Sequence, residues 1–174
     1  MNDLKIITER LTIRPFVDGD LDDLTVLIRD KMAGKYAFSD TQWPTDDASM
    51  KDILAYYMSE EPWSWCAVEL NETKHVIGFV CAGGDMTRGF GYTIRSDYQN
   101  KGYASEAGNA LLSYCINNLG TTRFVTGTAD CNIPSVKLLH MLGFSKIRSF
   151  EASFTKDAEG NPIMFAAGEY ERIV

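Results

Sequence analysis

The stretch from Tyr92 to Ala104, YTIRSDYQNKGYA, constrains this chain more than any other part of it. A strand-like run ends at about Arg95, a polar loop with one glycine follows, and helical periodicity begins near Lys101. Such a loop points several backbone N–H groups one way, and the helix dipole adds partial positive charge. Gly102 permits close backbone approach, and Lys101 adds a charge. These features suit a pyrophosphate-binding loop, although from the residues alone an ordinary strand-to-helix turn that contains a glycine is the plainer interpretation.

Other catalytic and phosphate-binding motifs do not fit the sequence. A P-loop needs GxxxxGK followed by Ser or Thr, and the chain has no such string. Gly89 and Gly91 have the first spacing of a dinucleotide fingerprint, but Ile94 stands where the third glycine belongs. HExxH and GxSxG are also absent.

The composition is that of one acidic globular domain spanning residues 1–174. The chain has 17 Lys and Arg against 24 Asp and Glu, a net charge of −7. This balance argues against nucleic acid as a partner, because phosphate binding needs a basic surface. No apolar run approaches the roughly 20 residues of a membrane span, and the first residues lack a signal-peptide pattern. We therefore expect no membrane association and a cytoplasmic location.

Metal chemistry is not expected. The 4 cysteines show no CxxC spacing, which favours small buried thiols in a reducing compartment. The 2 histidines, His75 and His140, are too few and too far apart for a histidine-based metal site.

Periodicity along the chain predicts a mixed sheet with helices on both sides, an α/β or α+β domain. The first expected strand lies within residues 4–16 and ends at Pro15. The others lie at Trp63–Leu70, His75–Ala82, Phe90–Arg95, Arg123–Thr128, Phe144–Thr155 and Ile163–Ile173. The expected helices follow caps at Asp18 or Asp20 and at Thr45 or Asp46, span Lys101–Asn118, and begin again at Pro134. Gly83, Gly84, Gly89 and Gly91 are loop signals that place a turn before Phe90, and Gly91 also falls within the expected strand.

Three short motifs occur together in the order found in one family. Q-x-x-G-x-A at 99–104 resembles the acetyl-CoA signature of the GNAT N-acetyltransferases. N-x-x-S at 132–135, followed by LGF at 142–144, resembles that superfamily's second motif. TERL at 8–11 with RPF at 14–16 resembles the start of its RimJ/RimL-like branch. From the residues alone, Asn132 and Ser135 are simply natural helix caps.

The resemblance implies the GNAT fold, a mostly antiparallel central sheet in which two splayed parallel strands hold acetyl-CoA. Those strands would be Phe90–Arg95 and Arg123–Thr128, with the backbone around Thr93 and Ile94 bonding the pantetheine arm. Asn132 would bond the pantetheine, and Ser135 would lie near the sulfur. The pyrophosphate would be held by backbone N–H groups of Gln99, Asn100, Lys101, Gly102, Tyr103, Ala104 and Ser105.

The implied reaction is direct attack of a primary amine, either a protein N-terminal α-amine or a small-molecule amine, on the thioester. Many relatives carry a general-acid tyrosine where this chain has Leu139, and a glutamate where it has Gly89. Asp85 and Tyr92 are therefore the candidate catalytic residues, with a loop acid and a core aromatic as their ordinary roles. A base acting through water, or no base, stays open.

The acceptor side can be addressed only through charge. Residues 1–62 hold 13 acids and 7 bases, and an acidic rim there would attract a cationic amine, although a solvated helix face is the plainer interpretation. The missing tyrosine and glutamate leave a second hypothesis open, an inactive GNAT-fold sensor or interaction module that binds CoA. Domains of this kind can form homodimers, and the sequence does not decide this.

Overall fold

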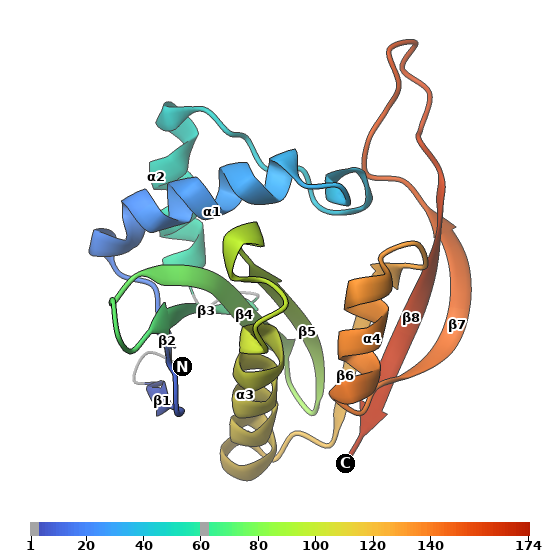
Figure 1. The fold of residues 1–174 in the computed structure, drawn as a ribbon. Helices are drawn as coiled ribbons and strands as arrows, with labels where there is room; N and C mark the ends of the chain where they lie inside the picture. Colours follow the sequence, from blue (N-terminus) through green and yellow to red (C-terminus); the bar gives the residue numbers. More distant parts are fainter. Residues whose placement is uncertain (1–3, 60–62) are drawn as a thin grey trace.

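The computed structural model describes residues 4–59 and 63–174, which form one sheet with helices on both faces (Figure 1). The sheet order is β1-β2-β3-β4-β5-β6-β8-β7. The strands are β1 (Ile6–Ile7), β2 (Leu11–Pro15), β3 (Trp63–Leu70), β4 (Val76–Gly84), β5 (Thr87–Ile94), β6 (Arg123–Ala129), β7 (Ser145–Ala152) and β8 (Phe165–Ile173). The helices are α1 (Leu21–Ala33), α2 (Asp47–Met58), α3 (Tyr103–Leu119) and α4 (Ile133–Met141), with short 3₁₀ turns η1 (Asp18–Asp20), η2 (Ala37–Ser39) and η3 (Ser96–Tyr98).

Neighbouring strands pair antiparallel except for β5 and β6, which run parallel over three residue pairs. The last of these pairs is Gly89 with Val125. Beyond it the two strands diverge, and we call this region, β5 from Phe90 and β6 from Thr126, the fork. The closed end is held by the Thr122 N–H, which donates to the Met86 carbonyl at 3.3 Å. The mostly antiparallel sheet with two splayed parallel strands is therefore confirmed.

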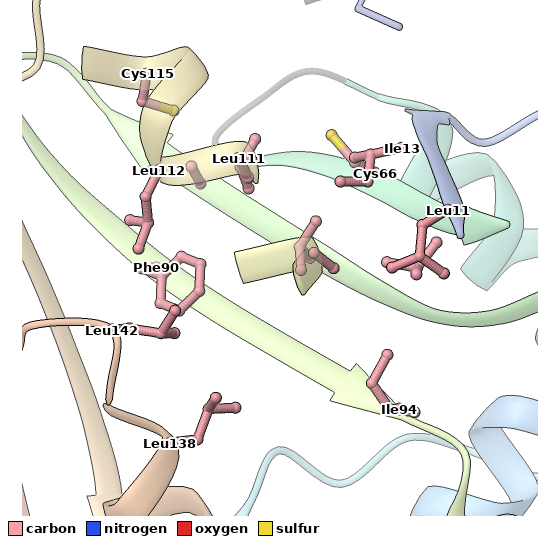
Figure 2. Packing of buried hydrophobic residues seen from close by; sticks show 14 of the residues in the cluster. Leu11, Ile13, Cys66, Phe90, Ile94, Leu111, Leu112, Cys115, Leu138 and Leu142 are labelled. Atoms are coloured by element: carbon pink, nitrogen blue, oxygen red, sulfur yellow. The ribbon is translucent and has the colours of Figure 1, made fainter. Parts of the chain in front are cut away.

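One hydrophobic core lies between the sheet and helices α3 and α4. Figure 2 shows Leu112 of α3 and Leu142, just after α4, on either side of Phe90 from β5. Gly108 on α3 makes this contact possible, since a Cβ there would lie 3.0 Å from Leu142 and 3.4 Å from Phe90. The same core thus contains residues of both strands of the fork, among them Phe90 of β5 and Phe124 of β6.

A second core lies on the opposite face of the sheet, under α1 and α2. Leu24 and Leu27 of α1 and Tyr57 of α2 are almost completely buried there. Asp46 caps α2 by accepting the Ser49 N–H at 3.0 Å, as predicted. These two helices pack on β3 and β4, so helices occupy both faces of the sheet.

A second link crosses the fork. The phenyl rings of Phe38 in η2 and Phe165 in β8 meet edge to face at 5.7 Å. The Thr155 hydroxyl donates to the Phe38 carbonyl at 3.4 Å. Thr155 lies in the hairpin between β7 and β8 that projects beyond the sheet at the top of Figure 1. The segment between α1 and α2 therefore contacts β8 and the β7–β8 hairpin across the open end of the fork.

Two sequence expectations were wrong in detail. Gly89, expected in a turn, lies inside β5 together with Gly91. At Gly91 a Cβ would lie 2.9 Å from the Cys81 Sγ on β4, so close packing and not a bend requires glycine. Asp20 stands at the N-cap position of α1 but makes no cap bond. Its carboxylate pairs with Arg14 at 2.7 Å instead.

Candidate active site

The loop between β5 and α3 has the backbone shape of an anion site. Asn100 and Gly102 both adopt left-handed conformations, with φ of 59° and 84°. Alternation between left- and right-handed residues turns successive N–H groups toward one side. Tyr103, Ala104 and Ser105 then form the first turn of α3, whose N-terminus has no side-chain cap. No side-chain cap occupies the donors of that turn, and its use by a phosphate stays a prediction.

The loop is tied to the sheet and to α1. The Gln99 side-chain amide donates to the Ile94 carbonyl at the end of β5, 2.8 Å away. Asp30 of α1 accepts the Ser96 N–H at 2.8 Å and the Ser96 hydroxyl at 2.5 Å. The Lys101 ammonium is turned back onto the Asp97 carbonyl at 2.8 Å. The loop is therefore held by hydrogen bonds to the end of β5, to α1 and within the loop itself.

The N-terminal motif reaches the same loop through a carboxylate of α3. Glu106 accepts hydrogen bonds from the Thr8 hydroxyl at 2.5 Å and from the Arg10 N–H at 3.0 Å. The Arg10 guanidinium donates to Glu106 at 2.7 and 2.6 Å, and to the Lys101 carbonyl at 2.9 Å. Partial burial opposes ionisation of Glu106, but these hydrogen bonds outweigh it and hold its pKa below the ordinary value. Sequence reasoning named the motif but missed this network.

Tyr92 and Ser135 meet across the fork. Tyr92 lies on β5 past the last parallel pair, and Ser135 lies in the first turn of α4. Their hydroxyl oxygens are 2.6 Å apart, and either one can be the donor. Burial raises the pKa of Tyr92 to about 12, and the contact with Ser135 opposes that rise. Two residues predicted separately, 43 positions apart, are therefore hydrogen-bonded partners.

The remaining cofactor candidates line the same region. Thr93 is half-buried and pairs with Phe79 of β4, while the Ile94 side chain is buried in the α3 core. Asn132 caps α4 by accepting the Ser135 N–H at 3.3 Å. That bond uses its carbonyl oxygen and leaves the amide NH₂ group to donate elsewhere.

Comparison with known proteins decides the family. The model of the acetyltransferase (GNAT) domain matches residues 10–145. This chain belongs to the GNAT family. It is an N-acetyltransferase, and its N-terminal motif resembles that of the RimJ/RimL-like branch.

Relatives of this N-acetyltransferase match most or all of the chain, either in sequence or in fold. An uncharacterized N-acetyltransferase p20 from Bacillus licheniformis is 30% identical, with 84% of this chain and 86% of that protein covered. A GNAT acetyltransferase structure from Bacillus anthracis matches with a TM-score of 0.82, 22% identity and 98% of each chain covered. A putative ribosomal-protein-serine acetyltransferase from Vibrio cholerae matches with a TM-score of 0.79, 21% identity, and 100% and 99% of the chains covered.

This acetyltransferase departs from many relatives at both usual catalytic positions. Leu139 is 1% exposed in the α3 and α4 core and has no hydroxyl to offer. Gly89 forms the last parallel pair with Val125 and has no carboxylate. Of the hydroxyl groups considered from the sequence, those of Tyr92 and Ser135 are the ones brought together at the fork.

Asp85 lies at the other end of β5. It is exposed in the turn between β4 and β5, beside Met86, whose carbonyl helps to hold the closed end. Tyr92 stands seven positions further along, beyond the parallel pairs. The structure therefore separates Asp85 from Tyr92 and Ser135, and Asp85 has no part in the proposed mechanism.

An Asp85→Asn enzyme is expected to keep kcat within about twofold of wild type, since substitutions away from a site change free energies by about 0.5 kcal/mol. Steady-state release of free thiol from acetyl-CoA measures this. A loss of 10-fold or more would mean that the closed end takes part in catalysis.

Two features are absent from the described residues. Among residues 4–59 and 63–174 no group of three or more potential ligands is placed to hold a metal ion. Within the same ranges, no helix is long and apolar enough to cross a membrane.

Proposed function

We propose that this enzyme transfers the acetyl group of acetyl-CoA to a primary amine by direct attack, with the cofactor held in the fork. The observation that carries the proposal is that the loop with left-handed Asn100 and Gly102 follows β5, the strand that carries Tyr92 of the Tyr92–Ser135 pair. The loop after β5 would supply N–H donors for an anion. The hydroxyl pair, which lies earlier along the chain at Tyr92 of β5, would supply a proton. An acyl carrier with a phosphate at one end and a thioester at the other fits this order.

Each part of the cofactor would have its own residues. The N–H groups from Asn100 to Ser105 would bind the pyrophosphate, since this segment leads into the N-terminus of α3. The Gln99 N–H already donates to the Ser96 carbonyl at 3.3 Å, so Gln99 would act by shaping the loop. The backbone around Thr93 and Ile94 would bond the pantetheine arm as an added strand, because β6 has left β5 by that point. Bound in this way, acetyl-CoA supplies the thioester carbonyl that the amine attacks.

The chain's own contribution to the chemistry is a held proton. Tyr92 Oη and Ser135 Oγ share a short hydrogen bond, so one hydroxyl would give its proton to the departing sulfur while the other donates a hydrogen bond to the oxygen left behind. The proton that the attacking amine loses would then restore the first hydroxyl. Because burial raises the Tyr92 pKa to about 12, its proton stays in place at neutral pH. Ser135 is also aligned by the N-terminus of α4, where developing negative charge is favoured.

The acceptor is proposed to be a protein α-amine or a small-molecule amine that arrives partly neutral. An α-amine with a pKa of about 8 is roughly one-tenth neutral at pH 7, so it needs less help than a lysine-like amine. The acidic rim suggested by the sequence is smaller than expected. Asp20 is paired with Arg14, and Asp23 accepts the Val76 N–H at 2.8 Å. Asp18 and Asp22 remain exposed to attract a cation.

Thermal unfolding with and without acetyl-CoA tests the cofactor assignment. At about 100 times its Kd, acetyl-CoA is expected to add about 2.7 kcal/mol to the free energy of unfolding. ATP and NAD, which carry phosphates but no pantetheine, serve as controls and should shift the Tm less. The absence of any shift at millimolar acetyl-CoA would contradict the proposal.

Release of free thiol with a panel of amines then separates the enzyme from a binding module. The panel includes peptides with free N-termini, polyamines and aminoglycosides. Binding of acetyl-CoA without thiol release for any amine would favour a CoA-binding sensor instead.

A further inference from the structure

We infer that Arg10 is a positioning residue for the cofactor, which locks the pyrophosphate loop in its binding shape through Glu106 and the Lys101 carbonyl. The inference rests on the proposed acetyl-CoA site and adds a residue to it. Arg10 lies on the connection between β1 and β2, about 90 positions before the loop in sequence. Its role would therefore be invisible in the loop motif itself.

The guanidinium is fixed from two directions at once. Its Nε and Nη2 atoms donate to one oxygen of Glu106 at 2.7 and 2.6 Å, and its Nη1 atom donates to the Lys101 carbonyl at 2.9 Å. The guanidinium carbon also lies 4.5 Å from the centre of the Tyr103 ring. Glu106 and Tyr103 belong to the first turn of α3, so Arg10 binds the helix start and the loop together.

The bond to Lys101 determines where the next N–H group points. In a trans peptide the C=O and the following N–H lie on opposite sides of the chain. Because Arg10 holds the Lys101 carbonyl on its own side, the Gly102 N–H is turned to the opposite side. A loop freed from Arg10 could rotate this peptide and lose the Gly102 donor. The bond thus orders the loop before binding, so that less conformational entropy is lost when the cofactor binds.

Arginine is required at this position because of its shape. Its planar fork reaches a carboxylate and a carbonyl at the same time, whereas the ammonium of lysine is a point donor on a flexible stem. Thr8 completes the arrangement, since its hydroxyl bonds Glu106 and also accepts the Leu11 N–H at 3.0 Å. The N-terminal motif and the acetyl-CoA motif are therefore parts of one hydrogen-bonded unit.

Arg10→Met tests the inference through the Kd and KM for acetyl-CoA. Both are expected to rise about tenfold, which corresponds to loss of one charge-assisted hydrogen bond in the loop. Saturating kcat and the KM for the amine should stay within about twofold, because Arg10 does not contact the reacting atoms. Arg10→Lys should weaken binding as much as Arg10→Met. Full recovery with lysine would show that charge near the phosphate is what matters, and would overturn the positioning role.

Arg29→Met is the matched control. Arg29 also bonds a carbonyl, that of Thr45 at 3.0 Å, and a carboxylate, that of Asp47 at 2.5 Å, but these partners stand at the start of α2 and not in the loop. Its loss should leave the Kd for acetyl-CoA unchanged. An equal effect of both variants would reduce the Arg10 result to a general loss of stability.

Backbone NMR relaxation in ligand-free protein provides a readout that does not depend on the proposed function. Order parameters of residues 99–102 should fall from about 0.85 to below about 0.6 in Arg10→Met and stay high in Arg29→Met. An unchanged loop in Arg10→Met would overturn the inference even if the wild type binds acetyl-CoA. If the wild type binds no acetyl-CoA but the loop loosens, the proposed function fails and the positioning role stands.

Discussion

Replacing Gly102 with valine is expected to weaken acetyl-CoA binding by about 100-fold, the loss of about two charge-assisted hydrogen bonds. Gly102 has φ of +84°, a conformation that β-branched residues strongly resist. A Cβ there would also lie 3.2 Å from Nη2 of Arg10, which is itself held by Glu106. The loop must therefore change shape to accept the side chain, and its N–H groups leave their common direction. Isothermal titration with acetyl-CoA measures the effect.

Gly120→Val separates this effect from strain alone. Gly120 ends α3 as Gly102 begins it, with φ of +66° and nothing within 4 Å of an added Cβ. Both variants should lose stability, by about 1–2 kcal/mol for a left-handed residue with a side chain. Only Gly102→Val should lose the cofactor. Equal binding by the two variants would contradict the loop assignment.

Replacing Tyr92 with phenylalanine is expected to lower saturating kcat by about 100-fold, the lower range of general acid catalysis. The ring remains to fill its place beside Phe90, so the fold and the KM for acetyl-CoA should change little. Ser135→Ala should have a similar effect, and the double variant should be little worse than either, because the two hydroxyls form one unit. Steady-state kinetics on all three variants measures this coupling.

The pH dependence of kcat offers a second check on Tyr92. A raised pKa means that the neutral, proton-donating form persists to higher pH, so Tyr92 loses its proton only as the pH nears about 12. Wild-type kcat should therefore show no descending limb from this residue at pH 8–10. Tyr114→Phe, on α3 outside the site, is the matched control and should behave as wild type. A normal kcat in Tyr92→Phe would mean that another group, or water, protonates the sulfur.

Much of the fold follows from local sequence. The helix over 103–119 was placed within two residues because its apolar spacing and Gly120 mark its face and its end. The hairpin of β3 and β4 was also found, from two apolar runs joined by a polar turn. Where glycine lies inside a strand instead of in a turn, as at Gly89, the same local rules failed. The presence of glycines alone does not distinguish a turn from a closely packed strand.

The candidate site was harder to predict because its parts meet only in the folded chain. The sequence identified Tyr92 and Ser135 separately, but their contact depends on how far β5 and β6 diverge. Asp85 was placed in the site from its position at a strand end, without knowledge of which end of the parallel pair is open. The bonds between Arg10 and Glu106 join segments 96 positions apart, and the first-turn glutamate was the one local signal that an anchor was present.

The fork also bears on how the molecule unfolds. Three parallel pairs, a shared core, the Phe38–Phe165 contact and the Tyr92–Ser135 bond are among the links between the two halves of the sheet. A seam with so few backbone bonds is where a folded chain opens locally before it opens as a whole. A cosubstrate bound between β5 and β6 would bridge the two strands and raise the free energy of this partial opening. The lifetime of the enzyme against proteolysis would then follow the acetyl-CoA supply of its surroundings, so that turnover and persistence respond to one and the same metabolite.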